Sequence, residues 1–291
     1  MRNRKNLFYA IILLLPAFGL YCAFLLYPIA QSVYMSFFKW KGIMNTPMIY
    51  AGIDNYRRVL IDPFFWNSML NVFWFMAGGF LVLMPLAFGL ALVITSKLRG
   101  LRFLKTAYFM PVIIPLTAVG LMWVYILQPN WGLFNTILQG LGVKDAAINW
   151  LGDPKTAIFS VVLVNEWIYA GFNMLIFAAG IMAIPEDIIE SAIIDGASSW
   201  QRLWRFTIPL CSESFKIFSI LCVTGCLRHF DLVYIMTRGG PNHATEMPTT
   251  LLYSQAFVYR NFGQGNAIGV IILVCGLVLT IILNKFLSRE D

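Results

Sequence analysis

The chain has 291 residues, of which 59% are hydrophobic and only 12% are charged. Soluble domains carry about 25% charged residues, so this composition excludes an ordinary soluble protein and predicts an integral membrane protein. The formal net charge of +7 comes from lysines and arginines at the ends of apolar segments. These residues form no single basic stripe, so anchoring in a lipid bilayer explains the charge more simply than nucleic-acid binding.

Six apolar segments reach the roughly 18 residues that identify a candidate membrane span. They are residues 7–33, 68–94, 106–127, 157–183, 208–236 and 266–285. We expect the first to remain as a span, because its charge-free run extends from Asn6 to Phe38 without a signal-peptide cleavage site. The fifth is the least regular, since charged or titratable residues interrupt it: Glu213, Lys216, Arg228, His229 and Asp231.

The basic residues predict which side of the membrane each loop occupies. Six spans place the two termini and the loops 96–105 and 185–207 on one side. That side carries a dense set of basic residues: Arg2, Arg4, Lys5, Lys97, Arg99, Arg102, Lys105, Lys285 and Arg289. Short cytoplasmic loops are enriched in lysine and arginine. We therefore expect a multi-pass protein with both termini in the cytoplasm.

The chain lacks the residues that hydrolysis of ATP and metal binding require. No Gly-Lys pair occurs, which excludes a phosphate-binding G-x-x-x-x-G-K-[S/T] loop. The two histidines have no cluster of carboxylates around them, and no nucleophile elbow is present. The five cysteines lie in or beside apolar segments without metal-ligand spacing. The sequence therefore predicts no catalytic site, no metal site and no cofactor in this chain.

The loop between the fourth and fifth spans is predicted to form a helix, a turn and a second helix. Pro185 suits the first position of a helix, and Glu186 and Asp187 favour its positive N-terminal end. Gly196 supplies a residue free to take positive φ, and Ser198 with Gln201 forms a capping-box pattern that opens the next helix. On these features alone, the alternative is an amphipathic hairpin that lies flat on the lipid headgroups.

A spaced motif within this loop resembles the EAA signature of binding-protein-dependent ABC importer permeases. That signature is E-A-A, three residues, G, and a distal L-P. The matching residues are Glu190, Ser191, Ala192, Asp195, Gly196, Ala197 and Pro209. Ser191 replaces the middle alanine, and Glu213 stands where many members have a second proline. The resemblance implies an all-α, type I importer permease fold of six transmembrane helices, in which this hairpin is the cytoplasmic coupling helix that docks into an ATPase subunit.

A second motif follows the fifth span. Gly239, Gly240 and Pro241 predict a tight turn at its outer end. Together with Thr245 and the later aromatic residues, this run resembles the carbohydrate-uptake branch of these permeases, the maltose and glycerol-phosphate type. The resemblance covers most of residues 105–285. It implies a sugar as substrate and an external loop that faces a sugar-binding protein.

Polar residues within the apolar spans are candidates for a substrate path, because they are costly there. Asn165, Glu166, Tyr169 and Asn173 fall on the fourth span, and charged residues fall near the end of the fifth. By motif spacing, the resemblance implies a sugar path along six positions: Asn165, Ile168, Tyr169, Cys222, Cys226 and His229. The alternative is that these side chains bond only to neighbouring helices.

The leading interpretation is one permease subunit of an ATP-driven sugar importer that works by alternating access. Its implied partners are a second permease, an external sugar-binding protein and a cytoplasmic ATPase dimer that binds ATP and Mg²⁺, all at the plasma membrane of a prokaryote. We expect residues 1–60 to form an N-terminal span with the first external loop, and residues 61–291 to form a five-helix core containing the coupling loop 185–210.

Two other classes compete with this interpretation. A stand-alone ion-coupled transporter would use Glu166, Arg228 and Asp231 as coupling charges, and inverted repeats would support it, but none is visible. A membrane-embedded enzyme or scaffold is disfavoured because the chain has no catalytic constellation.

Overall fold

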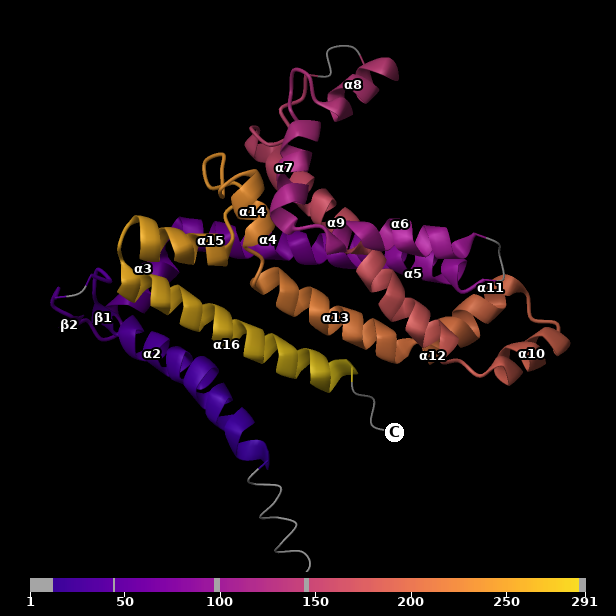
Figure 1. Cartoon of the computed structure of the whole chain (residues 1–291), viewed down its shortest axis with the longest axis horizontal. Coiled ribbons are helices and arrows are strands. Elements are labelled where there is room, and N and C mark those ends of the chain that lie inside the picture. Colours follow the sequence, from indigo (N-terminus) through magenta and orange to yellow (C-terminus); the bar gives the residue numbers. More distant parts are fainter. Residues whose placement is uncertain (1–12, 44, 97–99, 144–146, 288–291) are drawn as a thin grey trace, which may run out of the picture. The chain divides into compact units, whose positions relative to one another are not determined.

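The computed structural model describes residues 13–43, 45–96, 100–143 and 147–287, and nearly all of its regular structure is helical (Figure 1). Several basic residues that predict the topology lie outside the described residues: Arg2, Arg4, Lys5, Lys97, Arg99 and Arg289. The chain divides into two compact units. The first comprises residues 1–62 and 251–274, and the second comprises residues 63–250 and 275–291.

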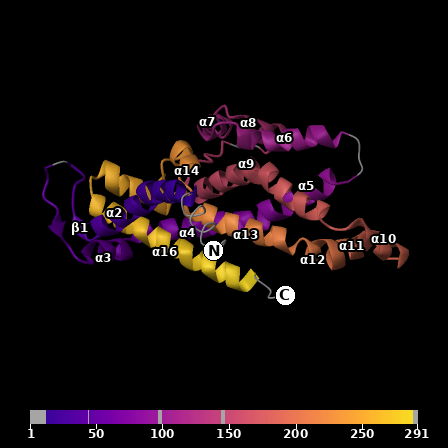
Figure 2. The same ribbon diagram turned by 60° about the horizontal axis from the view of Figure 1, so that its bottom comes forward.

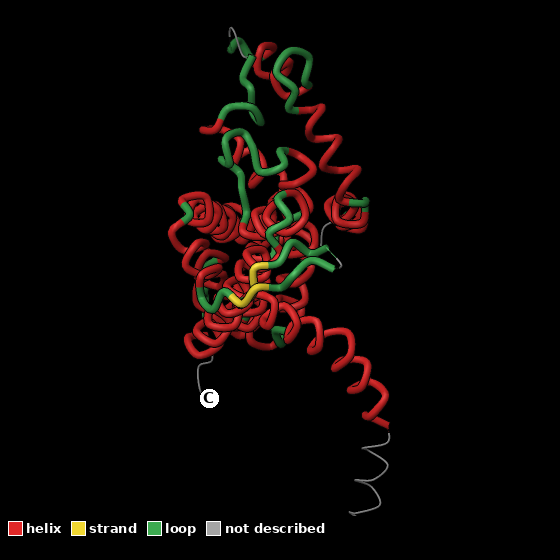
Figure 3. Tube along the Cα trace, turned by 90° about the vertical axis from the view of Figure 1, so that its left-hand side faces the viewer, coloured by secondary structure: helices red, strands yellow, loops and turns green. Residues whose placement is uncertain are grey.

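The first unit contains one long helix, a short hairpin and the segments that lead into the last helix. Its elements from the N-terminal part of the chain are the π-helical turn η1 (Cys22–Leu26), α2 (Tyr27–Ser36), β1 (Phe38–Lys39), β2 (Ile49–Tyr50) and α3 (Asp54–Ile61). From the C-terminal part come α15 (Pro248–Tyr253), the π-helical turn η4 (Ser254–Val258) and α16 (Phe262–Leu287). Helices α15 and α16 belong partly to the second unit. The strands pair antiparallel, with Phe38 opposite Tyr50, and are yellow in Figure 3. The long helix, Leu13–Ser36, is apolar enough to cross a membrane.

Buried and charged side chains hold the hairpin of the first unit in place. The amide nitrogen of the buried Asn55 donates to the carbonyl oxygens of Ser36 and Phe38, at 2.7 and 2.9 Å. Asp54 forms an ion pair of 2.7 Å with Lys39, and the lysine lowers the pKa of that carboxyl. The end of α2, strand β1 and the start of α3 are therefore tied together.

The second unit is built around the helix α9 (Pro154–Met182). A helix made of α4 (Pro63–Gly78), the π-helical turn η2 (Gly79–Leu83) and α5 (Met84–Ile94) packs against it, as do α6 (Leu101–Ile113) and α13 (Ser212–Leu227). Figure 2 shows α5, α9 and α13 side by side. Apolar side chains fill the space between them, including Leu83, Ala87, Met174, Phe177 and Phe218.

A glycine lets α6 approach α9 closely. A Cβ placed at Gly171 would overlap the backbone carbonyl of Tyr108. Inside a membrane, burial from water supplies no driving force for helices to associate, so tight packing matters more. Small residues at helix contacts allow two backbones to come close enough for such packing. A larger side chain at Gly171 would push the two helices apart.

Two of the predicted spans are bent. Residues Phe103–Ile113 of α6 and the helix α7 (Leu116–Ile126) meet at 97°, and Pro111 and Pro115 flank the break. Residues Ser199–Leu210 and α13 meet at 62°. Proline lacks an N–H donor and clashes with the preceding turn, which accounts for the first bend.

The fifth span differs from the continuous segment that its composition predicts. Helix α13 ends at Leu227, residues 228–230 are not helical, and α14 (Asp231–Met236) begins a new helix. Arg228 and Asp231 on either side of the break are exposed. Arg228 and Asp231, two of the charged residues that interrupt the apolar pattern, therefore coincide with a break in the helix itself.

The all-α membrane fold predicted from the sequence is confirmed. Within the described residues, four helices are long and apolar enough to cross a membrane, and the number reaches six if each bent pair forms one span. The predicted count of six therefore holds only when both bent pairs are counted as spans.

Candidate substrate cavity and coupling loop

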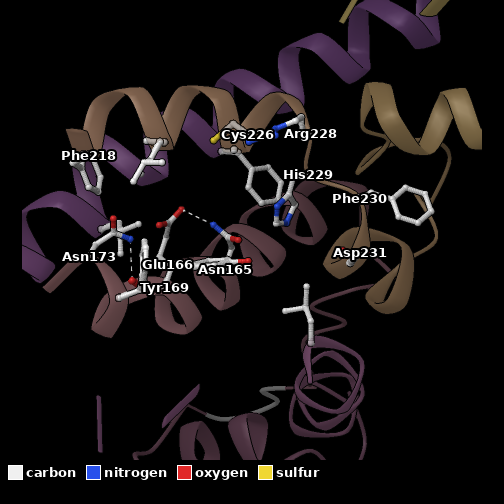
Figure 4. Close-up of a pocket in the computed structure, with 18 residues that line it drawn as sticks. Asn165, Glu166, Tyr169, Asn173, Phe218, Cys226, Arg228, His229, Phe230 and Asp231 are labelled. Carbon is white, nitrogen blue, oxygen red and sulfur yellow. Dashed lines mark hydrogen bonds between the residues drawn. The ribbon is translucent and has the colours of Figure 1, made fainter. Parts of the chain in front are cut away.

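A cavity of about 430 Å³ lies in the second unit between η2, α9, α13 and the break before α14 (Figure 4). Helix α9 contributes Asn165, Glu166 and Tyr169 to its wall. Asn165 and Tyr169 are four residues apart and therefore share one face of the helix. The non-helical segment after α13 brings His229 into the same wall.

The cavity gathers most of the residues predicted to line a sugar path. Asn165, Tyr169, Cys222, Cys226 and His229 all line it, although they come from two distant segments of the chain. The sixth predicted residue, Ile168, is 2% exposed and is not among the residues that line this cavity.

Three residues that line the cavity each carry a buried polar atom with no hydrogen-bond partner among the described residues. The atoms are Oδ1 of Asn165, Oε2 of Glu166 and Nε2 of His229. The amide nitrogen of Asn165 donates to Oε1 of Glu166 at 3.4 Å, which Figure 4 shows as a dashed line. Buried polar atoms are normally paired, so these three lack bonds that such atoms usually make.

Glu166 is a cavity residue that the sequence identifies as a polar candidate of the fourth span but that is not among the six positions implied by the resemblance. It is 2% exposed and lies beside Asn165 on α9. Its position as an acidic residue within an apolar span is the signal that identifies it, because such residues are functional candidates by default.

Aromatic rings complete the wall and give the cavity apolar faces. The ring of Phe75 lies 4.6 Å from that of His229, and Tyr169, Phe172 and Phe230 also line the space. Amides, a carboxylate and aromatic rings are the groups that bind small polar molecules in pockets. The described residues contain no group of three or more His, Cys, Asp or Glu that could hold a metal ion. The cavity is therefore suited to binding a small polar molecule.

The predicted helix–turn–helix between the fourth and fifth spans is present. Helix α10 (Glu186–Ile194) begins directly after Pro185, and Gly196 has a φ of +78° in the turn. The second helix begins at α11 (Ser199–Arg202) and continues through the π-helical turn η3 (Leu203–Thr207) and α12 (Ile208–Leu210). Ser198 and Gln201 form the predicted capping box, in which each backbone N–H is accepted by the other side chain.

The hairpin lies at the end of the second unit, beyond α9 and α13 (Figure 1). It exposes several apolar side chains. Ile194 is 85% exposed and Trp200 is 67% exposed. Most residues of the EAA-like motif are also exposed, namely Glu190, Ser191, Asp195, Gly196 and Pro209, while Ala197 is half-buried and Ala192 is buried. Exposed apolar patches beside polar groups mark interaction surfaces.

The predicted outer turn is held by a network of hydrogen bonds. Gly239 has a φ of +83°, and the hydroxyls of Thr237 and Thr245 lie 2.7 Å apart. The buried amide nitrogen of Asn71 on α4 donates to the carbonyl oxygens of Ala244 and Glu246, both at 2.9 Å. The loop is therefore fixed to α4 rather than free.

Comparison with known proteins identifies the family. Residues 84–290 match the family described as binding-protein-dependent transport system inner membrane component. The chain belongs to this family. The match includes the cavity residues of α9 and α13, the EAA-like motif and the outer turn.

Individual relatives extend over nearly the whole chain. The trehalose/maltose transport system permease of Thermococcus litoralis is 33% identical over 280 residues, which are 94% of this chain and 92% of that protein. An osmoprotective compounds uptake permease of Synechocystis is 33% identical over 289 residues, 94% of this chain and 98% of that protein. A solved structure of a bacterial alginate ABC transporter, in complex with a periplasmic protein bound to an alginate pentasaccharide, has a TM-score of 0.82 at 23% identity. The match covers 97% of this chain and 94% of that chain.

Family membership confirms several predictions from the sequence. The chain is a multi-pass permease component of an ABC transporter with the predicted importer permease fold, and as a permease it is not itself an enzyme. A stand-alone ion-coupled transporter is not favoured. The roles of the individual site residues stay predictions.

Proposed function

We propose that this permease moves a sugar or oligosaccharide from an external binding protein into the cytoplasm through the cavity on α9 and α13. The observation that carries the proposal is the set of unpaired polar atoms on Asn165, Glu166 and His229 beside aromatic rings. Hydroxyl groups pair with such atoms, and sugar rings pack on aromatic faces. A trehalose/maltose permease among the relatives supports a sugar as the substrate.

Energy enters through the hairpin of α10 and α11. The exposed motif around Glu190 and Gly196, with Ile194 and Trp200 beside it, docks into a cleft of a cytoplasmic ATPase subunit. ATP and Mg²⁺ bind to that ATPase dimer. This arrangement places the loops 96–105 and 185–207 and both termini in the cytoplasm of a prokaryotic cell, with the chain in the plasma membrane.

Two further partners complete the importer. A second permease of similar fold closes the sugar path from the other side, and an external sugar-binding protein delivers the substrate near the loop at Gly239, Gly240 and Pro241. The fixed conformation of that loop supports a docking role, because a preformed surface loses less entropy on binding.

The test is isolation of the assembly followed by reconstitution. After mild detergent extraction, the chain is expected to co-purify with an ATPase and a second permease, and the assembly should take up sugar only when ATP and the binding protein are both present. Uptake by the purified chain alone, driven by an ion gradient, would contradict the proposal and favour the ion-coupled alternative.

A further inference from the structure

A hydrogen bond connects the segment after the outer turn to the wall of the cavity. The hydroxyl of Thr249, in the first turn of α15, donates to the backbone carbonyl oxygen of His229 at 2.5 Å. His229 lies 20 residues earlier, in the break between α13 and α14. Thr249 itself is not among the residues that line the cavity. Its hydroxyl therefore acts on the backbone of the wall and not on the contents of the cavity.

The break supplies a continuous part of that wall. Residues 228–230 are not helical, and residues 228–231 all line the cavity. Backbone groups outside a helix lack the regular partners that a helix provides, and at membrane depth they must find partners in the protein or in a water-filled cavity. The hydroxyl of Thr249 is such a partner for His229. The positions of the four side chains consequently depend on the contacts that hold this backbone.

A second connection between the outer turn and the break runs along α4. Asn67, Asn71 and Phe75 are four residues apart and therefore share one face of the helix. The amide nitrogen of Asn67 donates to the carbonyl oxygen of His243 at 2.6 Å, and that of Asn71 donates to two further carbonyls of the outer turn. One helical turn further, the ring of Phe75 lies 4.6 Å from the ring of His229. The same face of α4 thus holds the outer turn at one end and contacts the break at the other.

The two contacts to His229 constrain different parts of the residue. Phe75 packs against the imidazole ring, whereas Thr249 bonds to the backbone. A hydrogen bond weakens steeply when its distance or angle departs from the preferred values. Thr249 is therefore the contact that fixes the path of the backbone through the break.

We propose that Thr249 is a positioning residue for sugar binding, because its hydroxyl holds the break in the conformation that places residues 228–231 in the cavity wall. The outer turn, which leads into Thr249, is then part of the support of the cavity. The inference rests on the proposed sugar import through this cavity and names a residue outside the cavity on which binding depends.

The experiment uses the complete assembly of permease pair and ATPase dimer in lipid nanodiscs. Equilibrium binding of maltose, trehalose and maltotriose is measured without the binding protein, so that only the cavity is probed. Thr249→Val keeps the shape of the side chain and removes the hydroxyl. It should bind the saccharide that the parental assembly prefers about 2- to 10-fold more weakly, because the lost hydrogen bond lowers the population of the binding-competent conformation. Thr249→Ser, which keeps a hydroxyl, should restore the parental affinity.

Thr156→Val is the matched control. The hydroxyl of Thr156, near the start of α9, also donates to a backbone carbonyl, that of Trp150 at 3.1 Å, and Thr156 does not line the cavity. The control should keep the parental affinity. The two valine variants lose bonds of the same kind and should unfold at similar temperatures. A difference in affinity between them is then not a difference in overall stability.

Hydrogen exchange tests the position of the break without any saccharide. The backbone amides of residues 228–234 should exchange faster in Thr249→Val than in the parental assembly or in Thr156→Val, because the segment opens more often once it loses this contact. Equal exchange in all three assemblies would show that Thr249 does not hold the break.

The binding measurements can overturn the inference in other ways. Parental affinity in Thr249→Val, an equal loss in Thr156→Val, or no recovery in Thr249→Ser would remove the positioning role and leave sugar import intact. Failure of Thr249→Val to assemble with the second permease would assign the hydroxyl to folding. A parental assembly without ATP-dependent sugar uptake in the presence of its binding protein would instead contradict the proposed function itself.

Discussion

Asn165 and His229 show how the chain concentrates polar atoms at one point of an apolar protein. Each carries a buried atom without a partner among the described residues, and both residues line the same cavity. Such atoms are costly in a membrane unless a ligand or water pairs with them. Their positions in the sequence identified both residues as candidates, because polar residues stand out in apolar spans. The sequence alone does not show which atom of Asn165 is unpaired, because that depends on the contact between its amide nitrogen and Glu166 in the fold.

Removal of either side chain should weaken transport without stopping expression. A hydrogen bond to a neutral partner contributes about 0.5–1.5 kcal/mol, so Asn165→Ala or His229→Ala should lower uptake by about 2- to 10-fold or change the preferred sugar. Uptake over a panel of saccharides measures the effect. The affinity of the binding protein for sugar should not change. Parental rates for every sugar in both variants would assign these residues to helix packing.

Asn71 should stabilise the outer loop from its position on α4. Replacing it with alanine leaves the carbonyl oxygens of Ala244 and Glu246 without their donor, and an unsatisfied buried group costs about 1–3 kcal/mol. Asn71→Ala should therefore lower the thermal unfolding temperature of the detergent-solubilised protein. Asn67→Ala, which removes one bond to the carbonyl of His243, should have a smaller effect. Equal melting temperatures for Asn71→Ala and the parent would show that the loop does not depend on this contact.

At the scale of elements, the hairpin 185–207 follows closely from its residues. Its first helix begins after Pro185, its turn uses Gly196 at positive φ, and its second helix opens with the Ser198 capping box. Each of these features depends on residues within one or two turns of the chain, so local chemistry suffices to predict it. The break at Arg228 was not predicted, because whether a charged residue interrupts a helix depends on its surroundings in the fold.

Gly196→Val should uncouple transport from ATP hydrolysis. A Cβ at this position meets no atom within 4 Å, so the change acts through the backbone. A β-branched residue at positive φ costs roughly 1–2 kcal/mol or more, which corresponds to about a 5- to 30-fold change in equilibrium. In reconstituted assemblies, binding-protein-stimulated ATPase activity should fall by about that factor while the chain still inserts.

Gly140→Val is the matched control for this prediction. Gly140 at the end of α8 (Leu133–Gly140) also has open space around its Cβ position but lacks positive φ. It should keep parental ATPase stimulation. Full stimulation in Gly196→Val would falsify the coupling role of the hairpin.

At the scale of the whole molecule, composition and the six apolar segments were enough to predict the fold class and the order of the membrane segments. The break before α14 and the assembly of the cavity were not predictable in the same way. The cavity joins residue 75 on α4 with residues 165–173 on α9 and residues 218–231. Contacts over such separations depend on how helices pack, and a hydropathy pattern carries no information about which helix faces which.

The sidedness of the membrane segments is the remaining property of the whole molecule that the basic loops predict. Ser96, Ser199 and Asn242 are all exposed in the structure. Only the membrane therefore limits the access of a thiol reagent to a cysteine at any of these positions. In a background without the five native cysteines, Asn242→Cys should react with a membrane-impermeant thiol reagent in intact cells. Ser96→Cys and Ser199→Cys should react only after the cells are opened, because the basic loop 96–105 and the hairpin then lie in the cytoplasm. Labelling of Ser199→Cys in intact cells would place the hairpin outside, where no ATPase could reach it.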